Sequence, residues 1–130
     1  MPLHDIFSNI MPGGETSTKW TRDMNGIYVM LAPIQLKDGL GETALIEASD
    51  GFQTGFASRQ PGILKRLLLR AKDGSYADLV FFASKEAADR VVEAERTSAA
   101  CHAYFEIMQI PEGVSPDMGV LSFEHVKTYE

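Results

Sequence analysis

The chain has 130 residues, a length at which one domain with a single hydrophobic core is expected. Its hydrophobic fraction of 45% and charged fraction of 23% exclude collagen-like, mucin-like and wholly disordered proteins. The net charge is −6 and the twelve basic residues are scattered, so the sequence offers no basic patch for nucleic acid or anionic lipid.

The cysteine content and the first residues of the chain bear on the cellular compartment of the protein. Cys101 is the single cysteine, which allows no internal disulfide. The residues after Met1 lack the basic segment and apolar run of a signal peptide. The longest apolar stretches also fall far short of the roughly 20 residues that cross a bilayer. We expect a cytoplasmic protein with no membrane segment and no nucleic-acid partner.

Residues 1–26 differ from the rest of the chain. Apolar residues recur at helical spacing up to Ile10, but the run Pro12–Gly14 and the polar residues after it prevent continuation. We interpret residues 1–26 as an N-terminal arm, which either packs on the domain or a partner subunit or is a loosely held terminus. Residues 27–130 then form the domain.

Residues 27–62 predict a strand followed by a helix. Residues 27–36 are rich in strand formers, and Pro33 within them indicates a bend or a sheet edge. After a turn at residues 37–39, apolar residues recur at three- and four-residue steps to Arg59, before Pro61 and Gly62 stop the helix. Gly51 and Gly55 inside this helix predict close approach to the sheet.

Two strands, residues 63–71 and 75–83, flank the turn residues 72–74 and predict a hairpin. A two-residue turn would mix polar and apolar side chains on both faces. A three-residue loop with Gly74 in the left-handed conformation pairs Leu68 with Asp78 instead. In this register the polar and apolar side chains are sorted between the two faces. We therefore predict one nearly continuous apolar face, formed by Lys65, Leu67, Leu69, Ala77, Leu79 and Phe81. The other face carries Arg66, Leu68, Arg70, Tyr76, Asp78, Val80 and Phe82.

A second helical region and a last strand complete the chain. Ser84 is a suitable N-cap for a helix, and Ser98 is suited to cap a further helical segment after the break at Thr97. Residues 120–129 alternate like a strand, with Leu121, Phe123 and His125 on one face.

The predicted order is strand, helix, strand, strand, helix, strand. This is the βαββαβ arrangement of α+β ferredoxin-like folds with a four-stranded antiparallel sheet. Two helices cover one face of such a sheet, and its other face, also apolar here, needs another partner. We therefore expect a homodimer.

From residue 27 onward the chain resembles the dimeric α/β-barrel superfamily, and within it the proteins grouped with antibiotic-biosynthesis monooxygenases. Four stretches carry the resemblance: residues 60–62, 72–78, 82–88, and 98–101 with Tyr104 and Phe105. Many members have Trp where this chain has Phe82. The resemblance implies a dimer that closes into an α/β barrel, and it covers enzymes of several kinds as well as proteins without known activity.

The resemblance also implies a ligand cavity between the sheet and the helices. The predicted register turns Arg66, Tyr76, Asp78 and Phe82 toward that space. Arg66 or Arg70 beside Asp78 would hold a polar group of a ligand or orient a substrate, or would form a buried ion pair. Aromatic residues at helical spacing predict either walls for a flat ligand or ordinary core, namely Phe52, Phe56, Tyr104 and Phe105.

Histidines are the other candidates for chemistry. His125 is our first candidate for proton transfer, with Asp78 or Glu124 tuning its protonation, and the alternative is a hydrogen-bonded structural histidine. His102 lies beside Cys101, but adjacent helical positions point about 100° apart, so we expect a surface or packing role. We find no metal motif and expect no metal, haem or flavin cofactor.

Two functions follow from these features. The first is a small-molecule enzyme resembling cofactor-independent monooxygenases, with an aromatic or polyketide-like substrate and with His125, Asp78 and Arg66 as catalytic residues. The second is a non-catalytic homodimeric module that binds a small hydrophobic ligand or supports another protein. A cavity lined by Phe82, Arg66 and His125 would favour the enzyme, and a solidly packed interior would favour the module.

Overall fold

A computed structural model describes residues 26–110, 113 and 119–129, so the predicted arm lies outside the described residues except for Gly26. The order of elements confirms the ferredoxin-like βαββαβ fold, with the second helical region divided into two helices. In chain order the elements are β1 (Tyr28–Ile34), α3 (Glu42–Gly55), the short 3-10 helix η1 (Ala57–Arg59), β2 (Ile63–Arg70), β3 (Tyr76–Phe82), α4 (Lys85–Glu95), α5 (Ala99–Glu106) and β4 (Leu121–Glu124).

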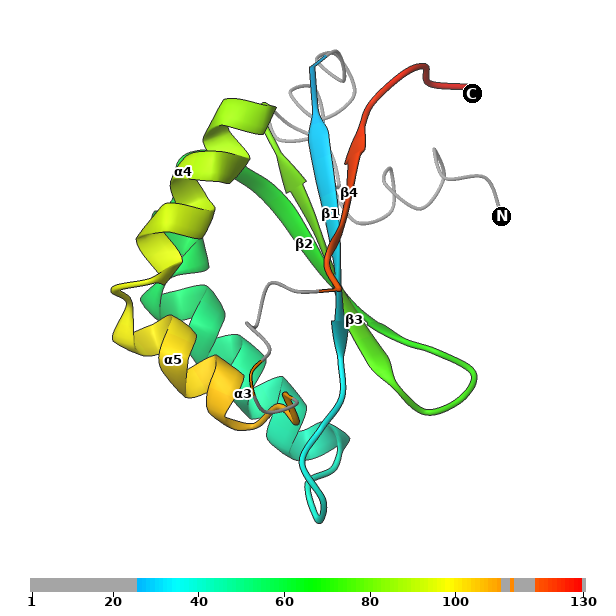
Figure 1. The fold of residues 1–130 in the computed structure, drawn as a ribbon, viewed down its shortest axis with the longest axis vertical. Coiled ribbons are helices and arrows are strands. Elements are labelled where there is room, and N and C mark those ends of the chain that lie inside the picture. The colour runs from blue at the N-terminus through cyan, green and yellow to red at the C-terminus, as the bar shows by residue number, and fades with distance from the viewer. Residues whose placement is uncertain (1–25, 111–112, 114–118, 130) are drawn as a thin grey trace, which may run out of the picture.

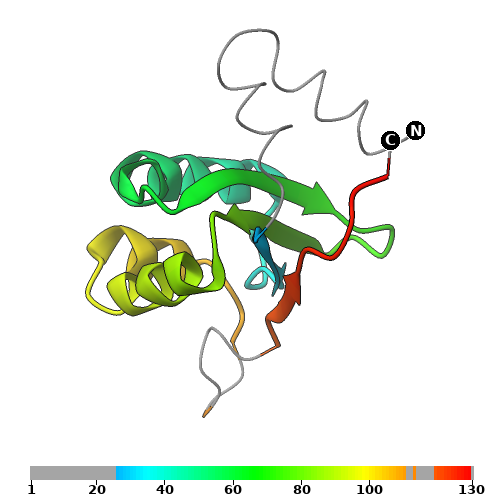
Figure 2. The ribbon, with the colours of Figure 1, turned by 90° about the horizontal axis from the view of Figure 1, so that it is seen from above.

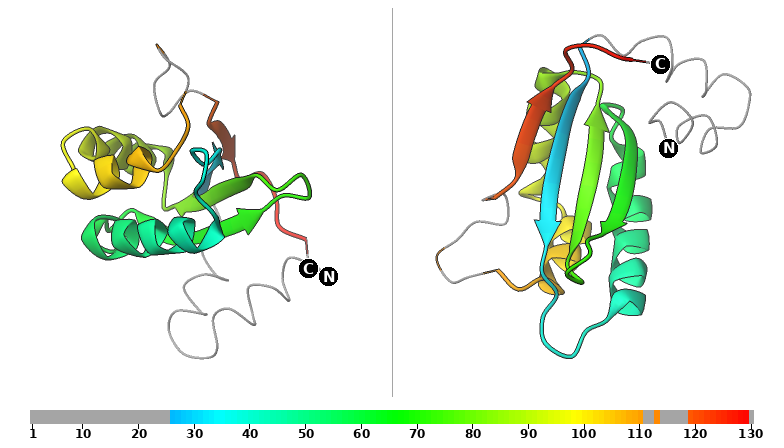
Figure 3. Two further views of the ribbon diagram at one scale, coloured as in Figure 1. Left: turned by 90° about the horizontal axis from the view of Figure 1, so that it is seen from below. Right: turned by 90° about the vertical axis from the view of Figure 1, so that its right-hand side faces the viewer.

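The four strands form one antiparallel sheet in the order β2-β3-β1-β4 (Figure 1). The described helices all lie on one side of it, with α3 in one row and α4 and α5 in the other (Figure 2). Figure 3 shows the opposite face of the sheet, in front of the helices and covered by no described helix. We call this surface the open face. None of the described helices has both the length and the apolar character needed to span a bilayer.

The β2–β3 hairpin has the predicted three-residue loop. Leu68 pairs with Asp78, and Gly74 has a φ of 89°, in the left-handed region where glycine carries no steric penalty. The amide of Ala71 donates to the carbonyl of Ser75 at 2.8 Å and closes the loop. Because the register fixes which side chains share a face, the predicted division of the hairpin residues between the two faces is confirmed.

Both predicted helix caps are present. The hydroxyl of Ser84 accepts a hydrogen bond from the amide of Ala87, and that of Ser98 accepts one from the amide of Cys101. Each cap satisfies an amide that the first turn leaves unpaired. Ser98 starts α5 in a new direction, which carries Tyr104 back over the sheet.

β4 is shorter than predicted, with four residues instead of the alternating run to Tyr129. The reason is that β1 begins at Tyr28, which pairs with Glu124, so the ladder ends there apart from one bond from the amide of His125 to the carbonyl of Ile27. β4 pairs only with residues 28–31 of β1. Pro33 lies beyond these residues, where β4 no longer flanks β1, and this agrees with the predicted sheet edge.

The helical glycines have a different role from the one predicted. A Cβ on Gly55 would lie 2.9 Å from the Cβ of Ala100, so Gly55 allows close contact with α5 and not with the sheet. A Cβ on Gly51 would meet no atom within 4 Å. The predicted approach of both glycines to the sheet is therefore wrong, and the close contact is between helices.

Apolar side chains form two clusters, one on each side of the sheet. The larger lies between sheet and helices and contains Leu45, Phe52, Phe82 and Tyr104. The smaller lies on the open face and centres on Ile27 and Phe81, with Val29, Leu64, Leu67 and Leu79 packed against it.

Candidate functional site

Polar side chains from four elements converge between the sheet and the helices. The guanidinium of Arg66 on β2 donates through Nη2 to both carboxylate oxygens of Asp78 on β3, at 3.1 and 2.9 Å. The same nitrogen lies 2.9 Å from the hydroxyl of Ser49 on α3, and Nη1 donates to the amide oxygen of Gln53 at 2.9 Å. The hydroxyl of Tyr104 on α5 donates to Asp78 at 2.8 Å. We call these five residues the Arg66 network.

Aromatic rings enclose the network. The guanidinium carbon of Arg66 lies 4.6 Å from the ring centre of Phe52 and 5.8 Å from that of Tyr104. The two rings stack at 4.7 Å, and Phe56 lies 5.5 Å from Phe52. A planar cation is attracted to such ring faces. The predicted aromatic residues Phe52, Phe56 and Tyr104 therefore lie together, and Phe82 belongs to the same buried cluster.

Burial makes the pairing of charges in the network important. The side chains of Arg66 and Asp78 are each only 7% exposed, so each charge depends on the other for compensation. Burial, and then the negative charge of Asp78, raise the pKa of Tyr104, which keeps its hydroxyl protonated as a donor. One group is left over, because the buried Nε of Arg66 has no hydrogen-bond partner among the described residues.

The alternative between Arg66 and Arg70 is resolved in favour of Arg66. Arg70 pairs with Glu42 at 2.7 Å at the surface, where this hydrogen bond lowers the pKa of Glu42. Tyr76 lies half-buried on the same face, at the margin of the core. Tyr76, one of the predicted ligand-binding residues, is the cross-strand partner of Arg70 and so lies beside this surface pair.

Sequence reasoning missed Ser49 and Gln53. Both lie on α3, and Ser49 is 8% exposed between the apolar positions Leu45 and Phe52. A small polar residue at the centre of an apolar helix face needs a hydrogen-bond partner, because an unpaired buried hydroxyl is costly. This signal was available in the sequence, and it would have pointed to a polar group on the sheet below.

His125 does not line the space occupied by the Arg66 network. Phe123 pairs with Val29, which belongs to the open-face cluster, and His125 follows two residues later, beyond the end of β4. Its Nε2 lies 2.7 Å from the hydroxyl of Thr128. A cavity shared by Phe82, Arg66 and His125, which would have favoured the enzyme over the module, is therefore not found among the described residues. The role of His125 in proton transfer stays a prediction.

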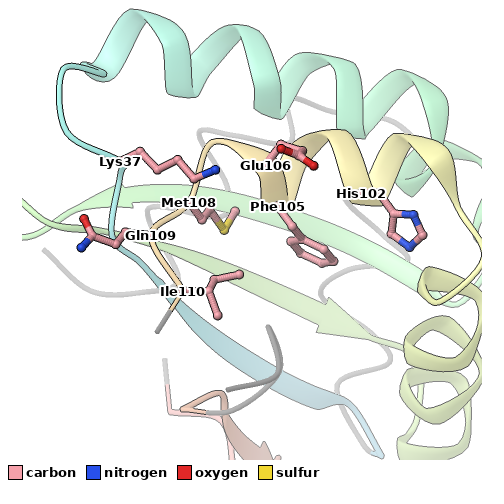
Figure 4. Close-up of a pocket in the computed structure, with 7 residues that line it drawn as sticks. All are labelled: Lys37, His102, Phe105, Glu106, Met108, Gln109 and Ile110. Atoms are coloured by element: carbon pink, nitrogen blue, oxygen red, sulfur yellow. The ribbon is translucent and has the colours of Figure 1, made fainter. Parts of the chain in front are cut away.

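A separate open pocket of about 440 Å³ lies at the end of α5 (Figure 4). Apolar side chains of Phe105, Met108 and Ile110 line it together with polar ones from Lys37, His102, Glu106 and Gln109. The Nε2 of His102 is 3.0 Å from the carbonyl of Arg96, so it acts as the donor and orients the ring. Of the aromatic residues predicted as possible walls for a ligand, only Phe105 lines this pocket, and the predicted catalytic residues His125, Asp78 and Arg66 do not.

Comparisons with known proteins show the fold. No protein-family model matches the sequence, and no curated protein sequence matches it significantly. SnoaB from Streptomyces nogalater, a cofactor-independent oxygenase, superposes with a TM-score of 0.59 at 16% identity, over 79% of this chain and 96% of its own. A candidate antibiotic-biosynthesis monooxygenase from Caulobacter crescentus gives 0.58 at 18% identity, over 85% and 99%.

A protein of unknown function from Nitrosomonas europaea is nearly as similar, with a TM-score of 0.56 at 13% identity, over 83% of this chain and 96% of its own. The fold of this chain is thus the ferredoxin-like fold that the sequence predicted, and SnoaB and the Caulobacter protein share it. At these identities the likeness concerns architecture, because one such fold carries several activities.

Proposed function

We propose that the protein is a homodimer in which the open faces of two sheets pack against each other. Three apolar residues at the margins of this face, Leu69, Leu121 and Phe123, are 40%, 52% and 50% exposed. Together with the half-buried residues of the open-face cluster they form a continuous apolar surface on one side of the sheet. An exposed apolar surface on a sheet promotes association with another protein surface. The open face of a second copy is apolar in the same way and can pack against it about a two-fold axis.

We further propose that the dimer is a small-molecule enzyme resembling cofactor-independent monooxygenases, with an aromatic or polyketide-like substrate. The observation that carries this proposal is the buried guanidinium of Arg66, which lies among aromatic rings and retains an unpaired Nε. An Arg in that setting suits an oxyanion on a flat ring, because charge-assisted hydrogen bonds are strong away from water. The fold shared with an oxygenase supports the reaction class.

In such a reaction the substrate itself supplies the electrons to dioxygen, so the protein has to bind the substrate, stabilise its deprotonated form and exclude water. Arg66 would hold the developing oxyanion through Nε. Asp78 would keep the guanidinium oriented, since both of its carboxylate oxygens accept from Nη2. Phe52 and Tyr104 would supply the aromatic walls. Substrate entry requires side-chain movement, because these groups pack closely against one another.

A second candidate function is a non-catalytic homodimeric module. The hydrogen bonds of Asp78 favour this function. Its carboxylate oxygens already accept from Arg66 and Tyr104, so the carboxylate is poorly placed to act as a base. In this case the Arg66 network only stabilises and orients the helices on the sheet. The module would bind a small hydrophobic ligand elsewhere or support another protein.

Oxygen consumption with a panel of hydroxylated naphthalenes and anthracenes separates the two functions. For the enzyme we expect turnover that Arg66→Gln lowers at least about a hundredfold, since one lost oxyanion donor typically costs this much. Arg70→Gln is the matched control, because Arg70 lies on the same face of β2 but pairs at the surface. Equal turnover in both variants, or no turnover and no binding by the wild type, would reject the enzyme and leave the module.

A further inference from the structure

The open pocket at the end of α5 carries two opposite charges that are not paired with each other. Lys37 lies just beyond β1 and Glu106 is the last residue of α5, and both exposed side chains line the pocket. The ion pairs among the described residues include neither of them. The volume of about 440 Å³ lies within the roughly 300–1,000 Å³ of small-molecule sites. We call this space the α5 pocket.

Backbone hydrogen bonds hold the walls of the α5 pocket together. The amide of Lys37 donates to the carbonyl of Ile107 at 3.1 Å, and the amide of Gln109 donates to the carbonyl of Gln35 at 2.7 Å. An isolated β-bridge lies between these two bonds. The backbone of Lys37 and Gln109 is therefore fixed relative to the end of α5, where Glu106 lies.

The polar groups of the α5 pocket divide into donors and acceptors. Lys37 can only donate, and the side-chain amide of Gln109 offers further donors. Glu106 accepts through its carboxylate, and His102 lies one turn before it on the same face of α5. Because Nε2 of His102 donates to the carbonyl of Arg96, Nδ1 of the neutral ring is an acceptor. The pocket thus combines a donor group with an acceptor group.

Apolar side chains form the floor between these groups. Phe105, Met108 and Ile110 line the pocket and are half-buried, and Figure 4 shows them below Lys37 and Glu106. The ring of Phe105 stacks against that of the buried Tyr104, with ring centres 6.4 Å apart. This floor offers an apolar part of a ligand a surface that is shielded from water.

We propose that the α5 pocket binds a small zwitterion with an apolar group, the class to which apolar α-amino acids belong. The carboxylate of the ligand binds Lys37 and Gln109. Its ammonium binds Glu106 and His102, and its side chain packs on the apolar floor. A single-charge ligand fits less well, because an anion is repelled by Glu106 and a cation by Lys37, whereas a zwitterion compensates both. The site is separate from the Arg66 network and does not rest on the function proposed above.

The first test titrates the full chain with L-leucine and L-phenylalanine, followed by NMR. Each is compared with its N-acetyl derivative, which lacks the ammonium, and with the corresponding amine, which lacks the carboxylate. We expect the amino acids to bind and the single-charge analogues to bind at least about tenfold more weakly, since each loses a charge-assisted hydrogen bond. Glycine, which has no apolar group, should also bind at least about tenfold more weakly.

The second test assigns the two ends of the ligand with two variants. Lys37→Met should weaken binding of the amino acids at least about tenfold without weakening that of the amines, which have no carboxylate to lose. Glu106→Gln should weaken binding of the amino acids to the same extent without weakening that of the N-acetyl derivatives. Lys72→Met in the hairpin loop and Glu47→Gln on α3 are the matched controls, because both side chains are exposed away from the pocket. Circular dichroism checks that each variant is folded.

Three results would overturn the proposal. They are no binding of either amino acid at millimolar concentration, equal binding of the single-charge analogues, and binding that Lys37→Met and Glu106→Gln leave unchanged. Each of them would leave the homodimer and the Arg66 network standing, because neither involves the α5 pocket.

Discussion

Removing the charge of Asp78 tests whether the Arg66 network holds the helices to the sheet. Asp78→Asn keeps the shape of the side chain but leaves the guanidinium, itself 7% exposed, without its counter-ion. The new amide group also places N–H donors where Arg66 and Tyr104 already donate. Breaking a buried ion pair from one side typically costs about 3–5 kcal/mol, and we expect a loss of unfolding free energy in this range. The melting temperature should fall by roughly 10–20 °C for a chain of this size.

The measurement is urea unfolding followed by circular dichroism at one fixed protein concentration, because the unfolding of a dimer depends on concentration. Glu42→Gln makes the same acid-to-amide change in the surface pair with Arg70, and little change in stability is expected there. Replacing both Arg66 and Asp78 by Leu removes the unpaired charge and should recover at least about 1 kcal/mol relative to Asp78→Asn. A loss below about 1 kcal/mol in Asp78→Asn would refute a structural role for the network.

Three other predictions concern packing, pH and proton transfer. Gly51→Ala should stabilise the chain by about 0.5–1 kcal/mol, since its Cβ meets open space, whereas Gly55→Ala, which would press on Ala100, should destabilise it by about 1–3 kcal/mol in thermal melts. The raised pKa of Tyr104 means that its contribution to stability is fully present below pH 10 and is lost as the pH rises beyond. Tyr104→Phe should therefore weaken the decline in stability seen above pH 10, and an equally steep decline would contradict this. The proton-transfer role predicted for His125 requires His125→Gln to lower turnover at least about a hundredfold with little change in melting temperature, and unchanged turnover would leave a structural histidine.

The sequence was sufficient for the parts of the fold that local rules determine. Gly74 in a three-residue loop set the register of the hairpin, and this register placed Arg66 and Asp78 side by side. Ser84 and Ser98 marked both helix starts through their capping chemistry. In each case the signal and the structure it specifies lie within a few residues of each other.

Other features depend on distant parts of the chain, and the sequence alone could not supply them. Alternation predicted a strand to Tyr129, but β4 ends where its neighbour β1 begins, at Tyr28. His125 was therefore placed on a strand that does not reach it. The close contact of Gly55 likewise depends on where α5 crosses α3, which only the packed structure reveals.

Light scattering coupled to size-exclusion chromatography tests the central claim, that two open sheet faces form the interface. At micromolar concentration the account predicts a mass of about twice the 14.3 kDa of the chain. Leu79→Asp, which places a charge at the centre of the open-face cluster, should dissociate or unfold the dimer. A well-folded monomer of the wild-type chain, or a Leu79→Asp variant that remains a stable dimer, would contradict the claim.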